Sequence, residues 1–327
     1  MRKTIILLSM LVLLSCKKDE PVPILDIWSI NTGNSELLSD AVSSQLYEDN
    51  ALSWYGTDKG LSRLQDSAWT EYSMGTFMLN NDQVSSLGLY SNEILIGTRG
   101  GGVNRLVVEG LDAVSGASPY DSVWTGLPSG HINCILVDAS EGKWFGTPLG
   151  LSLHEGDATK EGWTSYTTDN GLVSNNVSVI VEGQSGEVWI GTDKGLSIIH
   201  DGQITNHSTG TPLEGRQIND ISVTCCGNAW LGCTGGLILM NISGEEATWE
   251  EITVFSGSNI TALLMDSDFD LWVGTDEGLS IYRDGSMLYK TELEVFNGLR
   301  ITDIFQFWVS VGLSITTEDG IFIVIKR

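Results

Sequence analysis

Four histidines are the first candidates for catalysis in this chain of 327 residues: His131, His154, His200 and His207. No Ser-His-Asp order and no Gly-x-Ser-x-Gly elbow accompanies them, although triads are recognised by geometry rather than by order along the chain. Only His131 directly precedes a segment that we predict to be an innermost strand. We therefore assign no catalytic residue and keep His131 as a candidate ligand-binding side chain.

One cluster of carboxylates copies the acidic spacing of a calcium-binding loop. Asp266, Asp268 and Asp270 are followed by Glu277, eleven residues after Asp266. Such a loop requires glycine at its sixth position, where this chain has Leu271. We interpret the segment as an ordinary turn between strands, and we predict no metal site and no cofactor.

Cysteines could act as metal ligands, as thiols or in disulfides. Four of the five lie in the body of the chain, and no spacing among them matches a zinc site. An oxidising compartment would permit a disulfide. We expect buried thiols, with one disulfide among Cys225, Cys226 and Cys233 as the alternative.

The fifth cysteine, Cys16, ends a segment that is typical of protein export. Arg2 and Lys3 precede an apolar run at residues 5–14 that is too short to span a membrane. The run ends in Leu13-Leu14-Ser15-Cys16, which resembles a bacterial lipobox. That resemblance implies acyl chains on Cys16, which would anchor the protein stably; an ordinary secretory peptide is the alternative.

The N-terminal region is therefore divided into two predicted parts, a lipoprotein signal peptide at residues 1–15 and a lipid-bearing cysteine with a charged tether at residues 16–23. We expect an outer membrane lipoprotein, on the cell surface or on the periplasmic side. The chain has 42 acidic and 17 basic residues and a net charge of -25. Such a surface repels phosphate backbones and anionic lipids, so we predict no nucleic-acid partner and membrane contact only through the lipid.

The rest of the chain repeats one unit. The pattern Trp-x-Gly-Thr-Asp-x-Gly-Leu-Ser occurs at residues 54–62, 189–197 and 272–280. Weaker copies surround Gly97, Gly146 and Gly232, and a seventh has Thr316 at the first glycine position. These positions are 41 to 49 residues apart, which is typical of propeller blades of four short strands. We predict an all-β fold over residues 24–327, a seven-bladed β-propeller of four-stranded antiparallel blades.

Each unit is interpreted as strands A to D, from the central channel outwards. An aliphatic residue followed by a small polar one, as in Val177-Ser178, begins strand A, and the Trp-x-Gly lies on strand B. The chain starts with a D-type strand at residues 27–30 and ends after a C-type strand at residues 321–325. The first strand should therefore complete the last blade as a 3+1 clasp, which removes an open sheet edge.

Ten of the eleven tryptophans occupy two columns of the repeat. Stacking on carbohydrate is one role for such rings, but packing neighbouring sheets together also requires a large ring at one repeated position. We predict this packing role for the strand-B and strand-D tryptophans, which are Trp54, Trp144, Trp189, Trp230 and Trp272, and Trp28, Trp69, Trp124, Trp163 and Trp249.

The repeat resembles the two-component-regulator propeller repeat, and the resemblance covers residues 24–327. It implies a sensor-type propeller of the kind that detects polysaccharide fragments in hybrid two-component receptors. No transmembrane helix, kinase or DNA-binding domain is recognised after the propeller, so we expect the binding module alone.

The D–A connections and the B–C turns of such a propeller share one face, because successive strands alternate in direction. Strands B and C repeat almost verbatim, whereas the residues before strand A differ in every blade, as an asymmetric ligand requires. Arginine can bind a carboxylate or two hydroxyls with its planar fork. We predict a ligand-binding site on this face from His131, Arg216, Arg300, Arg99, Asn176 and Asn259.

The favoured function is a non-catalytic, lipid-anchored module that recognises a glycan fragment or a protein partner on this face. One alternative is a propeller enzyme, similar to a polysaccharide or lactone lyase, that uses residues at the channel mouth. The other is a purely structural partner within an outer-membrane complex.

Overall fold

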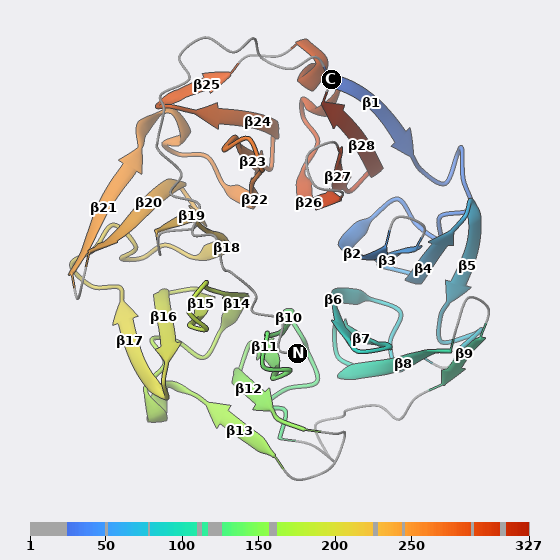
Figure 1. The fold of residues 1–327 in the computed structure, drawn as a ribbon, viewed down its shortest axis with the longest axis horizontal. Helices are drawn as coiled ribbons and strands as arrows, with labels where there is room; N and C mark the ends of the chain where they lie inside the picture. Colours follow the sequence, from blue (N-terminus) through green and yellow to red (C-terminus); the bar gives the residue numbers. More distant parts are fainter. Residues whose placement is uncertain are drawn as a thin grey trace, which may run out of the picture.

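Seven sheets of four antiparallel strands are arranged around a central axis (Figure 1), which confirms the predicted all-β, seven-bladed propeller. The computed structural model describes residues 25–49, 52–77, 79–109, 113–116, 126–156, 162–224, 228–243, 246–288, 291–307 and 312–326. The predicted signal peptide, Cys16 and the tether lie outside these residues, as do Trp124, Cys225 and Cys226. The described helices are three short 3-10 turns, at Thr168–Asn170, Thr253–Phe255 and Thr291–Phe296, and none of them is long enough to cross a membrane.

The first six blades each use four consecutive strands, ordered from the innermost to the outermost. Blades 1 to 3 are β2 (Val42–Asp49), β3 (Leu52–Thr57), β4 (Gly60–Gln65) and β5 (Ala68–Tyr72); β6 (Val84–Tyr90), β7 (Glu93–Thr98), β8 (Val103–Glu109) and β9 (Ala113–Gly116); and β10 (Cys134–Val137), β11 (Lys143–Thr147), β12 (Gly150–His154) and β13 (Trp163–Tyr166). Blades 4 to 6 are β14 (Val177–Glu182), β15 (Val188–Thr192), β16 (Gly195–His200) and β17 (Gln203–His207); β18 (Ile218–Val223), β19 (Ala229–Cys233), β20 (Gly236–Ser243) and β21 (Glu246–Ile252); and β22 (Ile260–Met265), β23 (Leu271–Thr275), β24 (Gly278–Arg283) and β25 (Ser286–Leu288).

Blade 7 combines strands from both ends of the chain. Its inner strands are β26 (Ile301–Phe307), β27 (Gly312–Thr317) and β28 (Gly320–Lys326), and its outermost strand is β1 (Leu25–Ile30). Leu25 pairs with Lys326 and Ile30 pairs with Ile321. Since β28 begins at the turn after β27, Ile30 lies near that turn and Leu25 lies at the opposite face of the propeller.

The tryptophans of the second strand pack between blades, as predicted. Trp54, Trp189 and Trp272 are almost completely buried, and each belongs to a hydrophobic cluster that includes the next blade. Trp272, for example, contacts the cluster that contains Ile301 and Ile304 of β26. The prediction is wrong for Trp28 on the outermost strand β1, where the ring is 54% exposed.

The repeated glycine of the second strand gives room to the next blade. A Cβ atom on Gly191 would lie 2.8 Å from Ile218 Cγ2, and one on Gly274 would lie 2.6 Å from Ile301 Cγ2. In both cases the close atom belongs to the first residue of the next innermost strand. The glycine column and the aliphatic column of the sequence are therefore two sides of one contact between blades.

Candidate binding site at the channel mouth

The turns between second and third strands lie against the connections that lead into the innermost strands. Arg99 N donates to Gln83 O at 2.9 Å, and Gly298 N donates to Glu277 O at 2.8 Å. Arg99 also forms an isolated backbone bridge with His131. These two kinds of segment therefore share one face, which we call the mouth face.

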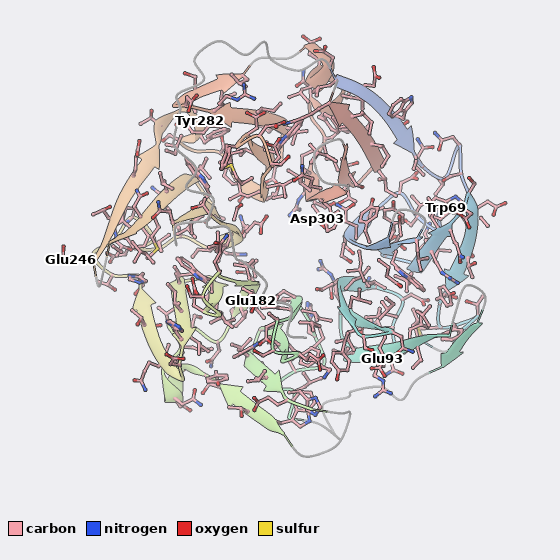
Figure 2. The ribbon with its side chains drawn as sticks, in the orientation of Figure 1. Trp69, Glu93, Glu182, Glu246, Tyr282 and Asp303 are labelled. Carbon is pink, nitrogen blue, oxygen red and sulfur yellow. The ribbon has the colours of Figure 1, made fainter. Side chains whose placement is uncertain are left out.

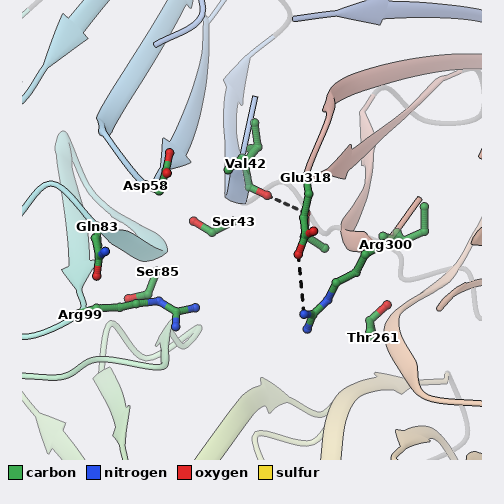
Figure 3. Close-up of a pocket in the computed structure, with 12 residues that line it drawn as sticks. Val42, Ser43, Asp58, Gln83, Ser85, Arg99, Thr261, Arg300 and Glu318 are labelled. Carbon is green, nitrogen blue, oxygen red and sulfur yellow. Dashed lines mark hydrogen bonds and ion pairs between the residues drawn. The ribbon is translucent and has the colours of Figure 1, made fainter. Parts of the chain in front are cut away.

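A cavity of about 400 Å³ opens on the mouth face. Four blades contribute to it: blades 1, 2, 6 and 7. Figure 3 shows the side chains of Arg99 and Arg300 reaching into the same space from opposite sides. The lining residues are Ala41, Val42, Ser43, Asp58, Gln83, Ser85, Arg99, Thr261, Arg300, Ile301, Thr302 and Glu318.

The two arginines of the cavity differ in their ionic partners. Arg300 lies 3.2 Å from a carboxylate oxygen of Asp276 and 3.8 Å from one of Glu318. No ion pair or side-chain hydrogen bond joins Arg99 to another described residue, and its side chain is exposed. The same holds for Asp58, on the corresponding turn of blade 1. The cavity therefore presents one guanidinium that is free to bind an anion.

The hydroxyls of the cavity come from a β-bulge that is repeated in the innermost strands. The pairing register shifts between Val42 and Ser44 and between Val84 and Ser86, so the bulge residues are Ser43 and Ser85. A bulge redirects a side chain out of the regular alternation. This redirection turns the hydroxyls towards the next blade and the mouth.

These side chains link each blade to the next one. Each donates, at 2.5 to 2.7 Å, to the carbonyl oxygen of the aliphatic residue that begins the next innermost strand or, for Ile132, lies two residues before it. The pairs are Ser43 and Val84, Ser85 and Ile132, Asn133 and Val177, Ser178 and Ile218, Asn219 and Ile260, and Thr302 and Val42. The seventh position differs, because Thr261 Oγ1 is buried and has no hydrogen-bond partner.

Two of the predicted site residues, Arg99 and Arg300, line the cavity. His131 lies beside Arg99, and burial together with the Arg99 charge lowers the pKa of the imidazole. His131 is therefore neutral at pH 7. Among the described residues, which include all four histidines, no imidazole lines the cavity.

The other predicted site residues lie outside the cavity. Arg216 pairs with Glu251 on β21, at 2.9 Å, on the outer side of blade 5. Asn259 donates to Asp276 at 2.6 Å and accepts a bond from Asn219 at 3.0 Å. Asn176 accepts a backbone bond from Asp193 N. The side chains of Arg216 and Asn259 are thus held by partners of their own, and neither these residues nor Asn176 line the cavity.

Two half-buried carboxyls on innermost strands, Asp220 and Asp303, were not predicted. Figure 2 shows Asp303 on the inner side of blade 7, and Asp220 occupies the same position of blade 5. Leu263 N of blade 6 donates to Asp220 Oδ2 at 2.6 Å. Burial raises the pKa of Asp220 to about 7 and that of Asp303 to about 6, although backbone N–H bonds act in the opposite direction. The sequence did contain a signal for these carboxyls, because Asp220 and Asp303 each directly follow the small polar residue near the start of an innermost strand.

The acidic turn of blade 6 holds a lysine ammonium. Lys326 Nζ contacts Asp266 and lies 3.1 Å from carboxylate oxygens of both Asp268 and Asp270. Arg283 binds Asp270 as well, with Nη2 at 2.6 Å. Through these ion pairs the acidic turn joins the C-terminal strand β28 to blade 6.

Cys134 and Cys233 are free thiols, and burial raises the pKa of each to about 12. Neither thiol is therefore a ready nucleophile at neutral pH. For Cys233 this confirms the expected buried thiol; Cys225 and Cys226 lie outside the described residues.

Residues 171–194 match the family model described as two component regulator propeller. The match covers one repeat of the chain, from the connection before β14 to the turn after β15. No curated protein sequence matches the chain. A similar solved structure is the extracellular domain of the hybrid two component system BT4673 from B. thetaiotaomicron. The two chains are 20% identical with a TM-score of 0.74, and the match covers 92% of this chain and 40% of that one. The chain thus spans less than half the length of that protein.

Two shorter propellers are similar over their whole length. Virginiamycin B lyase from Staphylococcus aureus has 14% identity and a TM-score of 0.68, with 93% of this chain and 100% of that chain covered. YCF48 bound to D1 peptide has 15% identity and a TM-score of 0.68, with 94% and 98% covered. At these identities the likeness shows a shared fold.

Proposed function

We propose that the protein is a non-catalytic binding module that recognises a glycan fragment or a protein partner in the cavity of the mouth face. The observation that carries this proposal is the position of Arg99, whose guanidinium lines the cavity with no ionic partner among the described residues. A cavity of about 400 Å³ is within the size range of small-molecule sites, about 300 to 1,000 Å³. The similar propellers include an extracellular domain of a hybrid two component system and YCF48 bound to D1 peptide, and both support a binding function.

The test uses the soluble protein from Lys18 to Arg327. A glycan array and affinity co-purification identify the ligand, and Arg99→Ala combined with Arg300→Ala should abolish its capture. Arg216→Ala is the matched control, because Arg216 lies on a neighbouring part of the molecule but outside the cavity. Capture that survives the double variant but is lost on changing turns of the opposite face, near Glu141 or Asp268, would contradict the assignment.

Lipid anchoring through Cys16 is part of the proposal. Leu25 lies at the face opposite the mouth, so a tether that ends there would hold the mouth face away from the membrane. The nine residues from Cys16 to Ile24, fully extended, would span at most about 30 Å between the lipid and Leu25. Cys16→Ala should release the protein from the membrane fraction, and a variant that stays as membrane-bound as the parent would exclude the anchor.

A lyase is the second candidate. It is supported by the neutral His131 beside Arg99, a base next to a charge that could stabilise a developing anion, and by the similarity to virginiamycin B lyase. Incubation with acidic polysaccharides and lactones should then yield unsaturated or opened products, detected by absorbance and mass spectrometry, and His131→Ala should stop their formation. No product with any of these substrates would exclude this candidate.

A further inference from the structure

The cavity wall has a directional preference for hydrogen bonds. The hydroxyl protons of Ser43, Ser85 and Thr302 are already donated to carbonyl oxygens of neighbouring blades, at 2.6, 2.5 and 2.7 Å. A hydroxyl has one proton and two lone pairs, so each of these groups can only accept a bond from a ligand. The carboxylates of Asp58 and Glu318 also only accept.

The charged donors of the cavity are the two arginines. Arg300 already has Asp276 and Glu318 nearby, which leaves Arg99 as the guanidinium without an ionic partner among the described residues. One such guanidinium matches one negative charge. A planar carboxylate fits its fork, and with one negative charge it is repelled less by Asp58 and Glu318 than a doubly charged phosphate.

We propose that the cavity binds a sugar acid, a ligand that carries several hydroxyls and one carboxylate. This inference rests on the proposed binding function and specifies its ligand. The carboxylate binds Arg99, with Arg300 on the other side of the cavity, and the ligand hydroxyls donate to Ser43, Ser85 and the acidic side chains. None of the described lining side chains is aromatic, so polar contacts rather than ring stacking provide the selectivity.

The size of the cavity indicates which part of a glycan enters. At about 400 Å³ it lies near the lower end of ligand-binding cavities, which is enough for one or two sugar units. We therefore infer recognition of a terminal acidic sugar rather than of a long internal segment.

The test is calorimetric titration at low salt with glucuronate and galacturonate as ligands, and with glucose, galactose and acetate for comparison. At least one of the two sugar acids should bind. Its neutral counterpart should bind at least about tenfold more weakly because it lacks the charged hydrogen bond to Arg99, and acetate should bind at least about tenfold more weakly because it lacks the hydroxyl contacts. Arg99→Ala should weaken sugar-acid binding by a similar factor. Lys194→Ala, which removes an exposed positive charge from the equivalent turn of blade 4, should leave it unchanged.

The outcomes separate this inference from the proposed function. If neither acid binds, or glucose binds as tightly as glucuronate, the sugar-acid assignment is wrong. Acetate binding as tightly as the sugar acids would show that the hydroxyls contribute nothing and would also overturn it. In each case, a neutral glycan or protein whose capture depends on Arg99 and Arg300 would leave the proposed function standing.

Discussion

The hydroxyl of Ser43, in the innermost strand of blade 1, donates a hydrogen bond of 2.6 Å to the carbonyl oxygen of Val84 in blade 2. The same bond recurs between five other pairs of neighbouring blades and is absent only between blades 6 and 7, among the described residues. Because each bond joins two blades, the series closes the centre of the propeller. The missing bond lies at the wall of the cavity, where Thr261 is unpaired.

This difference predicts opposite effects for two identical substitutions. Thr302→Val removes the bond to Val42 O, at 2.7 Å, and should lower the free energy of unfolding by about 1 to 2 kcal/mol. Thr261→Val replaces a buried hydroxyl that has no partner, so stability should be unchanged or higher. Urea unfolding of both variants measures the difference, and equal losses would contradict the assigned bonds.

The glycine column predicts a second effect on stability. An alanine Cβ at Gly191 would lie 2.5 Å from Val179 Cγ1 and 2.8 Å from Ile218 Cγ2, so Gly191→Ala should lower the free energy of unfolding by about 1 to 3 kcal/mol. Gly75→Ala is the control, because the nearest atom there is Ser73 Oγ at 3.8 Å, and it should stay within about 0.5 kcal/mol of the parent. A similar free energy of unfolding for both variants would contradict the requirement for glycine at this contact between blades.

The repeat predicted the fold because every blade solves the same packing problem with the same residue types. The first residues of the innermost strands follow directly from the aliphatic column, as at Val84 and Ile260. Trp28 was assigned wrongly, since its ring is 54% exposed, whereas Trp69, Trp163 and Trp249 of the same column pack partly buried against the core clusters.

The binding site was harder to predict, since it depends on which side chains find partners. The sequence does not show which arginine is paired: Glu251 of β21 pairs with Arg216, while Arg99 has no such partner among the described residues. The carboxylates that bind Lys326 lie 56 and 60 residues before it along the chain, in the neighbouring blade. Such pairings are set by tertiary geometry and leave no local pattern.

The buried ion pairs of Lys326, on the last strand, predict a large loss of stability when its charge is removed. The side chain of Lys326 is 9% exposed, and those of Asp266 and Asp270 are 1% exposed. Lys326→Met should cost about 3 kcal/mol or more, because buried carboxylates lose their main counter-charge. Lys194→Met, at an exposed turn, should have no measurable effect. Equal thermal stability of the two variants would show that the acidic turn is solvated.

The first strand predicts the consequence of removing one end of the chain. A protein that begins at Thr32 lacks β1 and leaves β28 as an unpaired edge with buried Leu25 missing from its cluster. Its melting temperature should fall by more than about 5 °C relative to a protein that begins at Ile24. Since the second protein retains the whole strand, equal melting temperatures would contradict a closing role for β1.

The half-buried carboxyl of Asp220 predicts an unusual pH dependence. Burial is the main cause that raises its pKa from the ordinary aspartate value of 3.8 to about 7, and the nearby charge of Asp303 acts in the same direction, while N–H bonds from Leu263 and Ile221 act against it. The folded protein therefore holds a proton that the unfolded chain releases near pH 4. This contribution to stability is complete below about pH 4 and is lost as the pH rises through about 7, with an upper limit of about 4 kcal/mol.

Asp220→Asn removes the titrating proton and keeps one acceptor oxygen for the N–H of Leu263. The free energy of unfolding of the parent, minus that of this variant, should fall steadily between about pH 4 and pH 7 and then stay constant. Urea titrations at one-unit intervals from about pH 4 to pH 8 provide the measurement. A difference that rises over this range would mean that the two N–H bonds outweigh burial and hold the carboxylate ionised.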